Sequence, residues 1–147
     1  MRLRNRYLVA QLLGPEADAL DVSSLTPQDL LSSLRDSAQT LFGDVGTGVH
    51  CANLAVKLFD KDSRRRLLVL RVSRSSFRQI WLALSCIQSI KRLPCTIRVL
   101  QVAGCHRTCK EKTLRISRRS FGGEESAVLG KEWESCSRRI EDALKDS

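Results

Sequence analysis

The chain has 147 residues, of which 42% are apolar and 28% are charged. This composition excludes a disordered chain, and the length allows one hydrophobic core but leaves little for a second, so we expect one globular unit. The formal net charge of +9 favours a polyanionic partner, either nucleic acid or an anionic membrane surface.

The positive charge is concentrated in the middle of the chain. Residues 64–119 contain 15 Lys and Arg residues and one acid, Glu111, which gives a net charge of +14. Residues 121–147 contain 4 basic and 7 acidic residues, a net charge of −3. Because a merely soluble surface mixes both signs, we interpret the middle segment as a surface for a polyanion.

The cysteines and the start of the chain bear on the compartment. Three of the six cysteines lie in apolar or strand-like runs, and a chain of this length needs no covalent staples, so a reducing compartment is expected. The apolar stretch at residues 7–13 is shorter than a signal-peptide core, and no run reaches the roughly 18 apolar residues of a membrane span. We expect a soluble intracellular protein without a membrane partner.

The first predicted elements are a strand and a helix. Residues 6–13 form an aliphatic run that ends at Gly14 and Pro15, which is typical of a strand. Thr26, Pro27 and Asp29 then supply an N-cap, a proline at the first helical position and an acid in the first turn. This pattern predicts a helix that Gly43 can end.

The central part of the chain alternates between strand and helix patterns. The glycine-rich residues 43–48 are expected to connect to a second strand at residues 49–59, and a turn at residues 60–63 leads to a third at 66–74. After the possible caps Ser75 and Ser76, apolar residues recur at helical spacing from Phe77 to Ile90. Pro94 is expected to stop this helix before a fourth strand at residues 96–103.

Two C-terminal helices are predicted at residues 107–121 and 124–144, although Leu114 and Ile116 also alternate as in a strand. The order of elements is typical of a ferredoxin-like, RRM-like βαββαβ sandwich, here an α+β fold with additional C-terminal helices. We divide the chain into a ferredoxin-like RNA-contacting domain, residues 1–121, and a helical extension, residues 122–147, that packs on the domain or on a partner.

The predicted sheet does not look like one that stacks RNA bases. The aromatic octamer of RNA-recognition modules is missing, and residues 67–72 are apolar on both faces of the third strand. Strands covered on both sides carry such continuous apolar runs, so we expect the C-terminal helices to cover the face that these modules leave open.

Phosphate recognition by basic side chains is the remaining mode. On a helix after the fourth strand, Arg107, Arg115 and Arg118 would share a face, with Lys112 and Arg119 beside it. Phosphate contacts give affinity and register but carry little sequence information, which suits a protein bound to one folded RNA.

Metal binding and independent catalysis are disfavoured. Cys105, His106 and Cys109, with Cys95 as a further candidate, lack the paired spacing of a zinc site. The other histidine, His50, has few acids near it, and turn chemistry explains the acids at residues 60 and 62. The glycine-rich residues 43–48 lack the Gly-Lys-Ser/Thr ending of a nucleotide-binding loop.

Several short segments resemble one known family. Residues 4–8, Arg-Asn-Arg-Tyr-Leu, residues 94–95, Pro-Cys, and residues 104–109, Gly-Cys-His-Arg-Thr-Cys, are similar to the Pop-five family of ribonuclease P and ribonuclease MRP subunits. The helix around Gln79, Ile80 and Trp81 adds to this resemblance, which covers residues 2–120.

The resemblance implies a scaffold role and a set of partners. In that family the RNA cleaves with magnesium ions and the protein stabilises it, so Mg2+ is expected at the RNA active site and no cofactor on the protein. The implied partners are the catalytic RNA, a barrel-shaped subunit of about thirty kilodaltons and the large Pop-one subunit. Precursor tRNA or rRNA would be the substrate of the complex, and the nucleus and nucleolus its location.

The predicted RNA contacts combine the basic clusters with the family-like motifs. They are Arg4, Arg6, Tyr7, Arg64, Arg65, Arg66, Lys91, Arg92, Arg107, Thr108, Lys110, Arg115, Arg118 and Arg119. Tyr7 and Thr108 could equally serve local structure. The main alternative function is a protein-interaction module with an incidental basic surface, and an independent nuclease is the third hypothesis.

Overall fold

The structure is a computed structural model that describes residues 4–14, 24–60, 66–120 and 127–145. Four strands form an antiparallel sheet in the order β2-β3-β1-β6. These strands are β1 (Asn5–Leu13), β2 (Ala55–Phe59), β3 (Leu67–Ser73) and β6 (Thr96–Ala103). This topology confirms the predicted α+β, ferredoxin-like sandwich.

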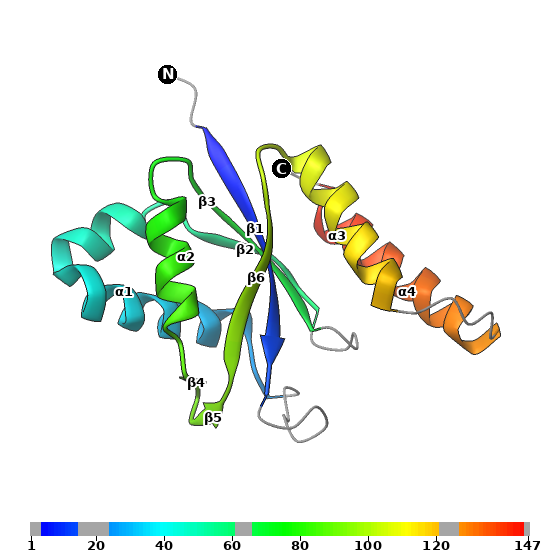
Figure 1. Ribbon diagram of the computed structural model, residues 1–147, viewed down its shortest axis with the longest axis horizontal. Coiled ribbons are helices and arrows are strands. Elements are labelled where there is room, and N and C mark those ends of the chain that lie inside the picture. Colours follow the sequence, from blue (N-terminus) through cyan, green and yellow to red (C-terminus); the bar gives the residue numbers. More distant parts are fainter. Residues whose placement is uncertain (1–3, 15–23, 61–65, 121–126, 146–147) are drawn as a thin grey trace.

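Helices cover both faces of the sheet (Figure 1). α1 (Pro27–His50) and α2 (Phe77–Ser85) lie on one face, while α3 (His106–Ser120) and α4 (Ala127–Ala143) lie on the other. α3 lies over β6 and β1, and α4 lies over β2. None of the helices in the described ranges has a stretch long and apolar enough to cross a lipid bilayer.

The alternation of side chains along the central strands builds two cores. Leu8 and Leu70 face α1 and α2, whereas Tyr7, Val9 and Val69 face α3 and α4. Burial on both sides explains why the sequence of β3 is a nearly continuous apolar run. The prediction that the C-terminal helices cover the second face is therefore confirmed.

The start of α1 and the break at Gly43 are confirmed, but the residues after Gly43 are helical. The Thr26 hydroxyl accepts a hydrogen bond from the Asp29 N–H at 3.3 Å, and the Asp29 carboxylate accepts one from the Thr26 N–H at 2.8 Å. Gly43, with φ 74° and ψ −175°, ends the first helical segment with a kink, but a second helical segment follows it and continues to His50 in place of the expected connection. The second strand accordingly starts at Ala55 and not at residue 49.

The second helix is shorter than its apolar spacing predicts. α2 ends at Ser85, and the segment after it forms a small hairpin of β4 (Ser89–Ile90) and β5 (Leu93–Pro94). Ile87 and Ile90 are nevertheless buried in the first core, because an extended segment can turn both toward the same helices. Pro94 therefore lies within a strand and does not stop the helix.

The predicted cap of α2 is also wrong in its chemistry. Ser76 is the residue before the helix, but its side chain makes no capping hydrogen bond. Its buried hydroxyl lies 3.0 Å from Nδ1 of His50, so it ties the end of α1 to the start of α2.

The two C-terminal helices are confirmed in type. α3 packs on the second face of the sheet through Cys109 and Ile116, and the C-terminal part of the chain packs there through Ile140 and Leu144. Asp60 at the end of β2 is buried and pairs with Arg139 of α4 at 3.5 Å. Residues 61–63 of the predicted turn at residues 60–63 lie outside the described residues, as does the predicted domain boundary after residue 121.

The kink at Gly43 gives a test of the fold. Gly43→Ala is expected to lower the free energy of unfolding by about 1–3 kcal/mol, because this backbone conformation is essentially restricted to glycine. Gly48 has helical backbone and no atom near its would-be Cβ, so Gly48→Ala is expected to be neutral or stabilising by about 0.5 kcal/mol. Denaturant unfolding measures both, and equal effects of the two substitutions would contradict the kink.

Candidate nucleic-acid interface

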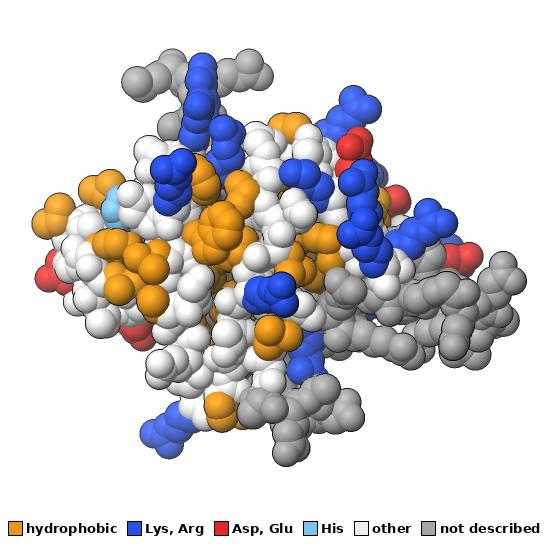
Figure 2. Space-filling view, viewed as in Figure 1, with side chains coloured by type: hydrophobic (Ala, Val, Ile, Leu, Met, Phe, Trp, Pro, Cys, Tyr) orange, Lys and Arg blue, Asp and Glu red, His pale blue; other side chains and the backbone are white. Residues whose placement is uncertain are grey.

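The helix α3 separates its buried and charged residues cleanly. Cys109, Thr113, Ile116 and Ser117 are buried against the sheet and α4. The opposite face of the helix carries exposed cations, namely Arg107, Arg115, Arg118 and Arg119. Figure 2 shows Lys and Arg side chains following α3, whereas hydrophobic side chains gather over α1 and α2.

Arg4 and Arg6, two further predicted RNA contacts, lie at the end of the sheet where α3 begins. The carbonyl of Arg4 accepts a hydrogen bond from the Arg74 N–H at 2.9 Å, which joins the start of β1 to the end of β3. The guanidinium of Arg6 lies beside Gly104, because a Cβ atom added at Gly104 would be 3.5 Å from Nη1 of Arg6. The start of β1 and the turn before α3 therefore meet, as Figure 1 also shows, and Arg6 lies close to the N-terminus of that helix.

Tyr7 and Thr108 occupy positions that favour the structural role left open for them. Tyr7 is 6% exposed, its ring meets the His106 ring edge-on at 5.9 Å, and burial raises the pKa of its hydroxyl. The Thr108 hydroxyl lies 3.1 Å from the Cys105 sulfur. Both side chains fix the first turn of α3, and the buried Tyr7 ring has no face free for base stacking.

The structure does not bring all predicted contacts together. Lys91 and Arg92 form the turn of the β4–β5 hairpin, at the end of the sheet away from the start of α3 (Figure 1). Lys91 pairs there with Asp29 at 3.3 Å. Arg66, beside Leu12, lies at this same far end, and Arg64 and Arg65 lie outside the described residues.

Within α3 the predicted contacts differ in exposure. Arg107 forms an ion pair with Glu111 at 3.3 Å, but its side chain is 89% exposed. Such an exposed pair contributes at most about 0.5 kcal/mol, so a phosphate can replace Glu111 at little cost. Lys110 is half-buried at the flank of the helix.

Arg71 and Arg98 are missing from the predicted set, although both lie in the +14 segment. Arg71 interrupts the apolar run of β3 next to Tyr7, and its Nε is buried without a hydrogen-bond partner among the described residues. Arg98 is exposed on β6, the edge strand beside β1. A lone arginine inside an apolar strand was the available signal for Arg71.

The cysteines around α3 have opposite protonation tendencies. Hydrogen bonds from the Thr108 hydroxyl and backbone lower the pKa of the exposed Cys105 thiol. Burial raises the pKa of Cys109 to about 11. Cys95 lies in the other core, on the far face of the sheet. Among the described residues, no three His, Cys, Asp or Glu side chains gather in a way that could hold a metal ion.

The two histidines also lie apart. His50 contacts Ser76 and the Phe42 ring on the α1 side, whereas His106 contacts Tyr7 on the α3 side. They are therefore not placed to cooperate as acid and base.

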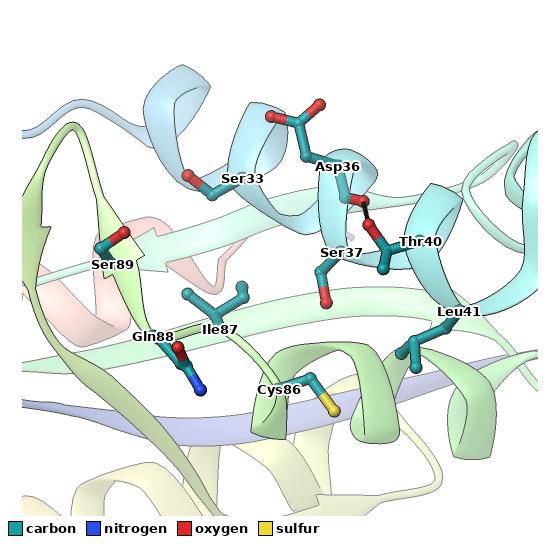
Figure 3. Close-up of a pocket in the computed structure, with 9 residues that line it drawn as sticks. All are labelled: Ser33, Asp36, Ser37, Thr40, Leu41, Cys86, Ile87, Gln88 and Ser89. Carbon is teal, nitrogen blue, oxygen red and sulfur yellow. Dashed lines mark hydrogen bonds between the residues drawn. The ribbon is translucent and has the colours of Figure 1, made fainter.

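A groove lies on the other side of the molecule, between α1 and the segment after α2 (Figure 3). Its volume is about 370 Å³, and its lining residues are Ser33, Asp36, Ser37, Thr40, Leu41, Cys86, Ile87, Gln88 and Ser89. The Ser37 hydroxyl donates to the Ala83 carbonyl at 2.8 Å, and the Thr40 hydroxyl donates to the Asp36 carbonyl at 3.0 Å. The lining includes an acid and no Lys or Arg, so this groove does not suit a phosphate.

The hydrogen bond between Thr108 and Cys105 can be tested by alkylation. Because the folded pKa is lowered, its thiolate should form at lower pH than in the unfolded chain, and iodoacetamide should label it first. Thr108→Val removes the hydroxyl and should move the pH profile of labelling upward, whereas Thr96→Val, exposed on β6, should not. Mass spectrometry follows each thiol, and Cys109 should remain unlabelled until the chain unfolds. An unchanged Thr108→Val profile would contradict the assignment.

Comparisons with known proteins agree on one family. The profile of the Rpp14/Pop5 family matches residues 6–114. The probable ribonuclease P/MRP protein subunit POP5 of Arabidopsis thaliana is 30% identical over 122 residues, which cover 80% of this chain and 80% of that protein. The ribonuclease P/MRP protein subunit POP5 of Schizosaccharomyces pombe is 36% identical over 111 residues, which cover 71% of this chain and 78% of that protein.

A solved structure supports the same fold. A chain in the cryo-EM structure of yeast ribonuclease MRP superposes with a TM-score of 0.55 at 14% identity, over 82% of this chain and 95% of that chain. The matched residues 6–114 extend from β1 into α3 and include Arg107, whereas Arg115, Arg118 and Arg119 lie beyond them. The chain belongs to the Rpp14/Pop5 family.

Proposed function

We propose that the chain is a non-catalytic protein subunit of a ribonuclease P/MRP ribonucleoprotein that binds and stabilises the catalytic RNA. The observation that carries this proposal is the exposed arginine face of α3, in a chain whose relatives are named as subunits of that enzyme. Guanidinium groups bind phosphate bidentately, and four on one helix match the repeated phosphates of an RNA backbone.

In this proposal the RNA supplies the reaction. Mg2+ ions belong to the RNA active site, and the substrates are precursor tRNA, trimmed at its 5′ end, or precursor rRNA. The protein contributes cations that neutralise crowded phosphates and so stabilise the folded RNA. The nucleus and nucleolus are the proposed location.

Protein partners are proposed for the opposite side of the molecule. Val45 and Val49, after the kink of α1, are 82% and 61% exposed, and Trp81 and Leu82 of α2 are 39% and 49% exposed. Exposed apolar residues grouped on neighbouring helices are typical of protein interfaces (Figure 2). We propose that the barrel-shaped subunit of about thirty kilodaltons and the Pop-one subunit are the partners of the assembled particle.

The second candidate function is a protein-interaction module whose basic surface is incidental. The same exposed apolar residues favour it. Purification of the tagged chain from cells, followed by sequencing of copurified RNA, separates the two functions. Ribonuclease P or MRP RNA in the purified material supports the proposal, and protein partners without either RNA would reject it.

The arginine face gives a quantitative prediction. A variant in which Arg107, Arg115 and Arg118 are all changed to Glu should bind ribonuclease P RNA more weakly. The slope of log affinity against log salt should be lower by about one unit per lost contact. The matched control changes Arg35, Arg138 and Lys145 to Glu, because these exposed residues lie on α1 and at α4. Filter binding at several salt concentrations measures both slopes. Equal slopes for the two variants would show that only total charge matters.

A further inference from the structure

A small cavity lies between the edge strand β6 and the helix α3. Its volume is about 170 Å³, and it is lined by Gln101, Lys112, Arg115, Ile116 and Arg119. β6 is the last strand of the sheet in the order β2-β3-β1-β6, so its outer side is free of a neighbouring strand in the described part of the chain. The cavity therefore combines a strand edge with one side of a charged helix.

Helical spacing explains how three cations reach one cavity. Lys112, Arg115, Ile116 and Arg119 follow one another at steps of three, one and three residues, which places them on one strip of α3. Ile116 at the base of this strip is buried in the second core and fixes the strip against β6. Arg107 and Arg118 lie further around the helix, so this strip shares Arg115 and Arg119 with the outward face and extends from it toward β6.

Lys112 is held in place by the edge strand. Its ammonium donates a hydrogen bond to the Val102 carbonyl at 3.0 Å, and its side chain is half-buried. An ammonium has three N–H donors, so two remain for another acceptor. The Gln101 side chain on the same strand can add an amide donor.

The charges around the cavity are uncompensated within the described side chains. Neither Lys112, Arg115 nor Arg119 forms an ion pair with a described carboxylate. Like charges at such spacing repel one another on a helix, and the lining residues include no acid. An anion in the cavity would remove this repulsion and accept hydrogen bonds from all three cations.

We propose that this cavity binds one backbone phosphate of the RNA, which rests on the proposed function above and names a contact within it. A phosphate fits better than a base, because the lining offers several donors and no aromatic ring on which a base could stack. The bound strand then passes from the outward arginines of α3 across the helix to the edge of the sheet. The site would fix the register of the RNA on the protein.

The main test compares two variants of the full chain that lose the same charge. Arg115→Gln with Arg119→Gln removes two cations from the cavity, and Arg138→Gln with Lys145→Gln removes two exposed cations near the chain end. Affinity for transcribed ribonuclease P RNA is measured against salt concentration. The cavity variant should bind about tenfold more weakly with a slope lower by roughly one unit, and the control should change less than about twofold.

One further variant and two further measurements keep the result specific. Arg115→Lys with Arg119→Lys retains the charges and should recover much of the slope, and circular dichroism shows whether each variant is folded. Titration of the chain with inorganic phosphate, followed by NMR, should shift the Gln101 and Lys112 signals in the wild type and not in the Gln variant.

Each failure has a separate meaning. If the wild type binds the RNA and the cavity variant behaves as the control does, the phosphate site is rejected while the proposed function stands. If the wild type does not bind the RNA, the proposed function is rejected. If inorganic phosphate saturates the cavity of the wild type but the cavity variant binds the RNA as tightly as the wild type does, the cavity is a site for free anions. This result would overturn its assignment to the RNA.

Discussion

The second face of the sheet must be covered, and the rest of the molecule depends on that constraint. Tyr7, Val9 and Val69 put large apolar groups on a face that a classical RNA-recognition module exposes to its ligand. Burying such side chains contributes roughly 1.5–3 kcal/mol each, which outweighs any single surface interaction. α3 and α4 supply the cover through Cys109, Ile140 and neighbouring residues.

In the function proposed above, covering this face moves RNA recognition from the sheet to the helix. Because the apolar side of α3 is committed to the sheet, its arginines must point outward or toward the edge strand. The proposed recognition through phosphates takes the place of base stacking, and it gives affinity and position without reading sequence. This suits the proposed contact with one folded RNA.

Much of this arrangement could be predicted from the sequence, because local patterns specify it. The alternating apolar strands, the capping box at Thr26 and the spacing of the α3 arginines all act over a few residues. The errors arose where two local patterns coincide. A glycine such as Gly43 can lead from a helix into a loop or into a second helical segment, and Ile87 and Ile90 satisfy helical spacing while lying in an extended segment.

Other features depend on contacts between residues far apart in the chain. Nothing near Tyr7 shows that its ring is buried against His106, and the pairing of Lys91 with Asp29 needs the folded arrangement of α1 and the hairpin. The cavity beside β6 depends on which side of α3 meets the edge strand. Sequence spacing identifies a charged face, but only tertiary packing decides how it is directed.

The central claim is that the cover of the sheet directs α3 toward the RNA. Ultraviolet crosslinking of the assembled particle, with mass spectrometric mapping of the crosslinked peptides, tests it most directly. The account predicts crosslinks at residues 107–119 and at the start of β1, and none on the outer faces of α1 and α2. Crosslinks confined to those outer faces or to the β4–β5 hairpin would contradict it.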